Sequence, residues 1–438
     1  TEEMMQVIDS VNKESTISVT GVVRERSSKN KDLATGEIEV VPEKIEILGK
    51  CIYNALPFEI NQSKDADENT RLKYRYLDLR NPAVKGNIVL RSKIVAELRQ
   101  KMNSLNFMEI TTPILTCSSP EGARDYLVPA RNHPGKFYAL PQAPQQFKQI
   151  LMASGFDRYF QIAPCFRDED ARADRSPGEF YQLDMEMAFA SQEDVFSVVE
   201  EVLPPVFEKY GVYKTASKAP FVRIPYLESM DKYGSDKPDL RIDLVLQDAT
   251  EVMADCGFGP FEGQTVKAIV VDGFTATRKV IDGICAEVEV QTANKAFWFK
   301  LDENGELVGG ISKFLQDRKE AVIAALGLKP GDFVGLTAGK KLAAQKTAGV
   351  LRKLLGAASD KHMKKDCYEF CWIVDFPMYE IGEESGELEF CHNPFSMPQG
   401  GMDALNNQDP LGILAYQYDL VCNGVELSSG AVRNHDPE

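Results

Sequence analysis

Arginines and carboxylates are interleaved in one short segment, whose residue types suit anion chemistry. Residues 165–175 contain Arg167, Arg172 and Arg175 among four carboxylates. Guanidinium groups hold phosphates and carboxylates through paired hydrogen bonds, and acids orient amines, hydroxyls or a metal ion. The segment is therefore a candidate anion-binding site. In isolation, a solvated loop over a half-exposed sheet is the simpler interpretation.

The segments on either side of this loop predict the strands that position it. Residues 182–187 alternate between polar and apolar side chains, and residues 158–166 also have a strand pattern. Alternation places Gln182, Asp184 and Glu186 on one face of a strand and the apolar residues on the other. We therefore predict an antiparallel hairpin. Its charged connection is longer than the roughly two to five residues of a typical hairpin turn.

Several blocks around the hairpin carry a family resemblance. Residues 106–115 and 166–169 resemble motifs 1 and 2 of the class II aminoacyl-tRNA synthetases. Residues 119–126, 145–148 and 233–239 resemble the bacterial aspartyl-tRNA synthetases in particular. The Phe-Arg-x-Glu pattern of motif 2 is weak alone. The blocks occur in the family's order and the resemblance covers nearly the whole chain, which makes it specific.

The resemblance implies an α+β fold with three parts. These are a catalytic domain built on the class II antiparallel sheet, an N-terminal OB-fold β-barrel present in part, and an inserted α+β GAD domain. Independently, alternating segments at residues 15–23, 36–41 and 45–48 favour a small β-barrel. OB-folds bind single-stranded nucleic acid, and a solubilising β-domain is the alternative interpretation.

The expected domain division follows from the resemblance and from changes in composition along the chain. It comprises a partial anticodon-binding domain (1–60), a linker (61–85), a catalytic domain with motifs 1 and 2 (86–241), a GAD-type insertion (242–365) and the rest of the catalytic domain (366–438).

A helix from Gly86 is predicted by apolar residues at helical spacing, ahead of a strand at residues 107–110 and Pro113. In class II enzymes this unit forms the dimer interface, so the resemblance implies a homodimer. The basic and aromatic residues at 71–80 fit either a tRNA contact or a surface over the domain junction. Lysines from Lys340 to Lys353 fit a solvated face, with a contact to the tRNA acceptor arm as the lesser alternative.

Composition limits the class of protein. Hydrophobic residues make up 43% of the 438 residues, which suits two or three globular domains. The formal charge of −16 argues against indiscriminate nucleic-acid binding but allows a local basic surface. We therefore expect selective, salt-sensitive RNA binding.

Nine cysteines without a Cys-x-x-Cys pair argue against a zinc site and favour a reducing cytosol. Cys367 and Cys371 are predicted to share the buried face of a strand. No apolar run approaches the ~20 residues that span a bilayer, and no signal peptide is present. We expect a cytoplasmic protein that does not contact membranes.

The reaction implied by the resemblance has two steps. L-Aspartate attacks the α-phosphorus of ATP to give aspartyl-adenylate and pyrophosphate, and the 3′ end of tRNA(Asp) then accepts the aspartate. tRNA(Asn) is a second candidate acceptor. Because the first step joins two anions, charge stabilisation and positioning should matter more than acid–base groups. ATP and Mg²⁺ are the expected small-molecule partners.

The resemblance assigns catalytic roles to three residues of this sequence. Arg167 would bridge the substrate carboxylate and the α-phosphate, and Glu169 would orient the adenine. Glu426 would contact ATP and hold Mg²⁺. Asp168 and Ser176 complete the expected ATP contacts, although several relatives carry Gln in place of Ser176 and Gly178 looks like a one-residue insertion.

The aspartate pocket is expected to hold the side-chain carboxylate with Lys148 and Arg433, and His392 would close it. Taken alone, Lys148 would be a helix-surface lysine. A pocket with buried cations should reject asparagine, whose amide leaves them unpaired. The remaining expected contacts are Glu121 and Gln145 for the α-ammonium and neighbouring polar atoms, with Arg167, Gln182 and Asp184 lining the pocket.

By the resemblance, we expect the glycine-rich motif 3, whose arginine holds the ATP γ-phosphate, and the opening OB-fold strands to lie outside the 438 residues of this sequence. We expect this 438-residue chain alone to be nearly inactive in ATP–pyrophosphate exchange. The alternatives are an asparaginyl or lysyl ligase and a non-catalytic tRNA-binding relative. A lysine pocket would need acids in place of Lys148 and Arg433, and intact Arg167, Glu169 and Glu426 count against a non-catalytic protein.

Overall fold

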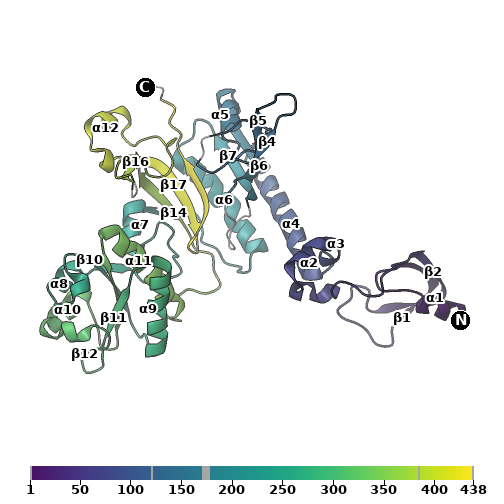
Figure 1. Ribbon diagram of the computed structural model, residues 1–438, viewed down its shortest axis with the longest axis horizontal. Helices are drawn as coiled ribbons and strands as arrows, with labels where there is room; N and C mark the ends of the chain where they lie inside the picture. Colours follow the sequence, from purple (N-terminus) through teal and green to yellow (C-terminus); the bar gives the residue numbers. More distant parts are fainter. Residues whose placement is uncertain (1, 120–121, 170–177, 383–384, 437–438) are drawn as a thin grey trace. The chain divides into compact units, whose positions relative to one another are not determined.

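The computed structural model describes residues 2–119, 122–169, 178–382 and 385–436 (Figure 1). The chain divides into two compact units, Thr1–Lys93 and Ile94–Glu438. The boundary falls inside helix α4 (Pro82–Ser104), which begins at a proline, a residue whose fixed φ suits the first helical turn. The finer five-part division remains a prediction.

The first unit contains a two-stranded antiparallel sheet of β1 (Thr16–Glu25) and β2 (Ile38–Gly49), preceded by α1 (Glu2–Asp9). The two segments predicted at 36–41 and 45–48 are one strand, because a register shift opposite Thr20 and Gly21 lets β2 continue past Pro42. In the described part of this unit, the sheet has only these two strands.

Short helices follow in the first unit: η1 (Ile60–Asp65), α2 (Glu68–Lys73) and α3 (Arg75–Asp78). Asp78 is fully buried, and both Arg71 and Arg75 form ion pairs with it. Burial alone would raise the pKa of Asp78, but a hydrogen bond with Ser63 and the two arginines outweigh that effect and lower the pKa. Part of the basic pattern at 71–80 is therefore structural.

In the second unit, β6 (Arg158–Phe166) and β7 (Glu179–Met187) form the predicted antiparallel hairpin, with Phe166 opposite Glu179. The short strand β3 (Met108–Glu109) pairs in parallel with β6. The alternation in β7 has the predicted effect, because Leu183, Met185 and Met187 all pack against one apolar cluster.

A second sheet has the order β18-β17-β14-β8. Its strands are β8 (Val222–Pro225), β14 (Phe370–Pro377), β17 (Leu414–Cys422) and β18 (Val425–Ala431). Cys371 is buried in β14, but Cys367 precedes the strand and is partly exposed. The prediction that the two cysteines share a buried strand face is therefore wrong.

Helix α6 (Gln192–Tyr210) packs against both sheets. It begins with a capping box between Ser191 and Asp194. Phe196 stacks on Trp372 of β14 with ring centroids 4.0 Å apart, and Val198 and Val202 belong to the cluster beneath the hairpin.

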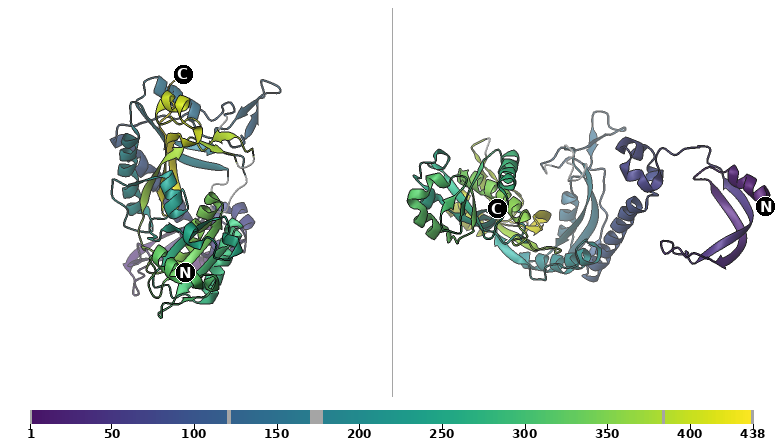
Figure 2. Two further views of the ribbon diagram at one scale, coloured as in Figure 1. Left: turned by 90° about the vertical axis from the view of Figure 1, so that its left-hand side faces the viewer. Right: turned by 90° about the horizontal axis from the view of Figure 1, so that it is seen from below.

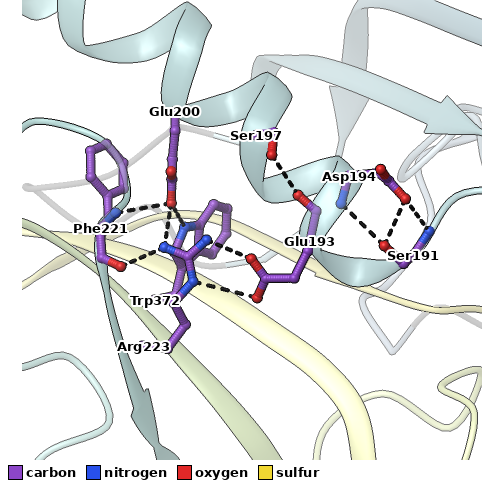
Figure 3. A network of polar contacts seen from close by, with 8 residues as sticks. All are labelled: Ser191, Glu193, Asp194, Ser197, Glu200, Phe221, Arg223 and Trp372. Carbon is purple, nitrogen blue, oxygen red and sulfur yellow. Dashed lines mark hydrogen bonds and ion pairs between the residues drawn. The ribbon is translucent and has the colours of Figure 1, made fainter.

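Figure 3 shows how buried Glu200 holds this helix in place. Its carboxylate accepts hydrogen bonds from Trp372 Nε1 (2.9 Å), the Phe221 amide (3.1 Å) and Arg223 Nη1 (2.7 Å). Arg223 also forms an ion pair with Glu193 at 2.8 Å. The network ties β8, β14 and α6 together.

Residues between β8 and β14 form a segment with its own antiparallel sheet, in the order β12-β11-β13-β10-β9 (Figures 1 and 2). Helices α8 and α10 contribute to one of its apolar clusters, and α9 and α11 to the other. The elements are β9 (Leu246–Asp248), α8 (Thr250–Met253), β10 (Thr265–Val271), α9 (Arg278–Thr292), β11 (Ala296–Leu301), β12 (Leu307–Val308), α10 (Lys319–Leu326), β13 (Phe333–Gly339) and α11 (Lys341–Ala357).

The remaining elements of the second unit are shorter. They comprise β4 (Leu127–Pro129), β5 (Phe137–Ala139), α5 (Gln145–Ala153), α7 (Tyr226–Tyr233), β15 (Tyr379–Ile381), β16 (Leu388–Phe390) and α12 (Gly401–Asn407), with 3₁₀ turns η2 (Gly259–Phe261), η3 (Ser312–Phe314), η4 (Gln316–Arg318) and η5 (Pro410–Gly412).

Candidate active site

A cavity of about 520 Å³ lies between β7 and β18. Trp372, Tyr418 and apolar residues of α6 form part of its wall. The structure brings together here the following residues predicted for the aspartate pocket: Gln145 and Lys148 from α5, Gln182 and Asp184 from β7, and Arg433 after β18.

Lys148 is the buried centre of the polar side of this cavity. Only 6% of the residue is exposed. Its Nζ lies 2.6 Å from Asp184 Oδ1 and 2.9 Å from Glu186 Oε1. Burial alone would lower the pKa of Lys148, but these two carboxylates outweigh that effect and raise the pKa. The helix-surface interpretation of this lysine is therefore wrong.

Arg433 extends the same network. Its Nη2 lies 3.4 Å from Gln145 Oε1 and 4.0 Å from Glu186 Oε1. Two cations thus face two carboxylates, and the described side chains around the cavity balance one another in charge.

Two buried polar atoms at this network have no hydrogen-bond partner among the described residues: Gln145 Nε2, a donor, and Asp184 Oδ2, an acceptor. An unsatisfied buried polar group costs about 1–3 kcal/mol, so such atoms call for an explanation. A ligand that carries both a carboxylate and an ammonium group would satisfy both atoms.

Arg167 lies where the long connection of the hairpin begins. Its amide donates to the Gly178 carbonyl at 2.7 Å, and its guanidinium lies 5.0 Å from the centre of the Phe180 ring. Phe180 lines the 520 Å³ cavity, whereas Arg167 contacts Phe180 but is not itself among the residues that line the cavity. Gly178 has φ +87°, and a Cβ there would meet the Tyr126 hydroxyl at 2.6 Å, which explains a glycine at this position.

The other residues predicted in this loop are only partly described. Asp168 and Glu169 are exposed. The Asp168 amide donates to the Arg124 carbonyl, and Arg124 Nε donates back to the Asp168 carbonyl, both at 2.9 Å. Glu121 and Ser176 lie outside the described residues.

A second group of acids, which we call the carboxylate end, comprises Asp236, Asp419 and Glu426 around Lys237. Lys237 Nζ lies 2.9 Å from Asp236 Oδ2 and 3.2 Å from Glu426 Oε2. Asp419 is 6% exposed, and its Oδ1 has no partner within the described part of the chain. Burial, followed by the charge of Glu426, raises the pKa of Asp419 to about 7.

His392 is not among the residues that line the 520 Å³ cavity. It lines a separate cavity of about 700 Å³ with Asp236 and Lys237, and its ring packs against Phe376 at 4.9 Å. Partial desolvation lowers the pKa of His392, although the nearby acids Asp236, Glu380 and Glu426 oppose this effect.

The carboxylate end has the donor chemistry that Mg²⁺ prefers. Mg²⁺ is commonly held by one or two carboxylates together with substrate phosphates. The unpartnered oxygen of Asp419 and the exposed carboxylate of Glu426 fit that arrangement. Over the described ranges, no cluster of three or more His, Cys, Asp or Glu side chains forms a complete metal site, so phosphate oxygens would be needed.

Sequence reasoning missed Asp419, Lys237 and Glu186 as site residues. A weak signal existed for Asp419, because it is an acid within the otherwise largely apolar strand β17. Buried acids without a partner are uncommon unless they have a function. Lys237 lies in the block 233–239 that carries the family resemblance, but nothing in that block indicates its contact with Glu426, which is distant in the sequence.

Comparisons with known proteins place this geometry in a family. The family model described as tRNA synthetases class II (D, K and N) matches residues 67–438. An aspartate–tRNA ligase of Streptomyces avermitilis is 52% identical over 437 residues, covering 99% of this chain and 74% of the relative. An aspartate–tRNA(Asp/Asn) ligase of Zymomonas mobilis is also 52% identical, with the same shares covered. The chain belongs to the aspartate–tRNA ligase family of class II tRNA synthetases.

A solved structure agrees with this class II membership at the level of fold. The crystal structure of a putative aspartyl-tRNA synthetase from Leishmania major has a TM-score of 0.55 and 21% identity. The match covers 100% of this chain and 70% of the other. The two chains therefore share a mixed helix and sheet fold.

Proposed function

We propose that this protein activates L-aspartate with ATP to form aspartyl-adenylate and then transfers aspartate to the 3′ end of tRNA(Asp). One observation carries the proposal: a buried lysine and an arginine face one cavity beside a donor, Gln145 Nε2, and an acceptor, Asp184 Oδ2, that have no hydrogen-bond partner among the residues the structure describes. Free aspartate carries two carboxylates and one ammonium, which matches this set of groups.

In this proposal, Lys148 and Arg433 hold the side-chain carboxylate of aspartate, and Asp184 and Glu186 attract its α-ammonium. The ion pairs of Lys148 at 2.6 and 2.9 Å keep both charges in place before the substrate arrives. Binding then exchanges partners within a balanced network and does not bury a new isolated charge. Asparagine would leave the cations without a carboxylate, so the pocket discriminates by charge.

For adenylate formation, Arg167 bridges the α-carboxylate and the α-phosphate, and its cation–π contact with Phe180, which lines the cavity, restrains the guanidinium. Arg167 thereby reduces repulsion between two anions and aligns them. Exposed Asp168 and Glu169 remain proposed contacts of ATP, with Glu169 at the adenine. Ser176 is a further proposed contact of ATP. Glu121 is a proposed contact of aspartate.

At the carboxylate end, Asp419 and Glu426 would hold Mg²⁺ together with ATP. The ion supplies positive charge that offsets the triphosphate. Lys237 positions the Glu426 carboxylate through their contact at 3.2 Å. His392 is proposed to close the substrate site from the 700 Å³ cavity.

tRNA(Asn) is a second candidate acceptor, because the similar Zymomonas relative is named for both tRNAs. The asparaginyl and lysyl alternatives are not favoured by the named relatives. We propose that residues 1–60 are part of an anticodon-binding OB-fold, and that residues 242–365 are a GAD-type insertion. Exposed lysines of α11 remain candidates for the acceptor arm.

We further propose a cytoplasmic homodimer. Exposed Ile88, Val89 and Leu90 of α4 are apolar surface that a second copy would cover. Across the described residues, no helix combines the length and apolar character needed to cross a bilayer.

The test is amino-acid-dependent ATP–pyrophosphate exchange by the full-length protein with aspartate, asparagine or lysine. Aspartate should support exchange, and asparagine and lysine should support at least a hundredfold less. Aminoacylation of tRNA(Asp) and tRNA(Asn) transcripts then separates the two acceptors. Exchange with asparagine or lysine in preference to aspartate would overturn the assignment of Lys148 and Arg433.

A further inference from the structure

Helix α11 of the inserted segment makes direct backbone contact with the loop that leads to the carboxylate end. Gly234 ends α7 with φ +67°, and a Cβ there would lie 2.3 Å from the Gln345 carbonyl oxygen and 2.5 Å from the Gly349 nitrogen. From the other side, a Cβ on Gly349 would lie 2.2 Å from the Gly234 carbonyl oxygen. Because neither position leaves room for a side chain, the two backbones fix one another's position.

Arg352, one turn further along α11, holds the next part of the same connection. Its residue exposure is 2%, and its guanidinium donates to the carbonyls of Leu244 (2.6 Å), Ile242 (2.6 Å) and Asp239 (3.1 Å). The guanidinium also lies 4.8 Å from the centre of the Tyr233 ring. One side chain of α11 therefore binds the chain on both sides of residues 234–239.

Residues 234–239 in turn contact the proposed nucleotide end of the site. Lys237 forms its 3.2 Å ion pair with Glu426. The turn between β17 and β18 also lies against residues 234–239, because a Cβ on Gly424 would lie 3.3 Å from Asp239 Cβ. This turn immediately precedes the strand that carries Glu426. A displacement of α11 would therefore move both Lys237 and the turn.

We propose that α11 is a positioning element for the nucleotide end of the active site, acting through the Gly234–Gly349 backbone contact and the Arg352 guanidinium. The inference rests on the proposed function, in which Glu426 contacts ATP. It assigns the inserted segment a role in ATP binding. Lys148, the buried cation of the aspartate pocket, should keep its position, because Asp184 and Glu186 of β7 hold it.

Gly349→Ala in the full-length protein is a sharp test. Alanine favours helix over glycine, so the helix itself should not weaken, and the added Cβ acts only by pushing against Gly234. Gly283→Ala is the matched control, because Gly283 is also a helical glycine of the inserted segment and has open space around its Cβ position. We expect Gly349→Ala to weaken ATP binding at least fivefold by calorimetry and to raise the KM for ATP in parallel. The KM for aspartate should change less than twofold, and Gly283→Ala should match wild type.

Arg352→Lys provides a second test, because lysine keeps the charge but cannot reach all three carbonyls with a planar fork. It should weaken ATP binding in the same selective way. Wild-type ATP affinity in both variants, or equal losses for ATP and aspartate, would overturn the inference. Calorimetry with ATP does not require turnover, so an absence of aspartate-dependent exchange in the wild type would reject the proposed function separately.

Discussion

Replacement of Lys148 by methionine should both destabilise the protein and weaken aspartate binding. Lys148 is buried between Asp184 and Glu186, so its loss leaves two carboxylates without their main counter-charge. Removing one partner of a buried ion pair costs about 3–5 kcal/mol. Arg433 remains 4.0 Å from Glu186 and offsets part of this cost. We therefore expect the free energy of unfolding to fall by about 3 kcal/mol, near the lower end of this range.

The effect on the substrate has a separate origin. A hydrogen bond to a charged group contributes about 1.5–3 kcal/mol, which corresponds to a roughly tenfold to 150-fold rise in the KM for aspartate. The KM for ATP should stay within a factor of about two, because Lys148 makes no contact at the carboxylate end. ATP–pyrophosphate exchange at saturating ATP measures the KM for aspartate, and urea unfolding followed by tryptophan fluorescence measures the loss of stability.

Two further variants separate these effects. Lys295→Met removes a lysine whose side chain is 68% exposed and should change stability by less than about 0.5 kcal/mol. Lys148→Met combined with Asp184→Asn removes one charge of each sign, so it should recover stability without recovering aspartate affinity. If Lys148→Met were as stable as Lys295→Met, or bound aspartate normally, the role given to this lysine would be refuted.

The remaining predictions concern three other buried or half-buried groups. Because the pKa of Asp419 is raised to about 7, the folded protein holds a proton that the unfolded chain releases, and stability falls as pH rises toward 7. Asp419→Asn should therefore raise the free energy of unfolding at pH 8 by at most about 4 kcal/mol, and by much less at pH 5; an equal change at both pH values would contradict this. Arg433→Met should reduce the preference for aspartate over asparagine by about tenfold in pyrophosphate exchange, less than Lys148→Met, because Arg433 is partly exposed. Glu200→Ala should cost about 2–4 kcal/mol in urea unfolding, because Trp372 Nε1 and the Phe221 amide lose their acceptor; Glu200→Gln, which keeps one acceptor oxygen, should cost less.

Local patterns were enough to predict the hairpin that carries Arg167. The alternation of residues 182–187 fixed which side chains share a face, and the structure places the apolar set against one cluster. β6 spans the predicted residues, Arg158–Phe166. The β2 segment was harder, because a proline interrupts the pattern and only pairing with β1 shows that the strand continues.

Patterns failed where a side chain's environment comes from distant parts of the chain. The local sequence of Lys148 fits an exposed helix position. Only the fold places Asp184 and Glu186 of β7 beside this lysine. The residues around Cys367 predict a strand there, but β14 begins at Phe370, after the cysteine. At the carboxylate end, Lys237, Asp419 and Glu426 come from separate segments of the chain, and no local sequence pattern predicts that they lie close together.

The two ends of the site differ in how their charge is balanced, and this difference suits the two substrates. At the pocket, Lys148 and Arg433 face two carboxylates, so an amino acid with both signs of charge can exchange partners without a net electrostatic cost. At the carboxylate end, three acids surround Lys237, and Asp419 has a pKa of about 7. Excess acid would repel a triphosphate unless a divalent cation bound between them. Partial protonation of Asp419 would lower that repulsion near neutral pH, and its carboxylate would be available as a ligand if a divalent cation bound there with the nucleotide.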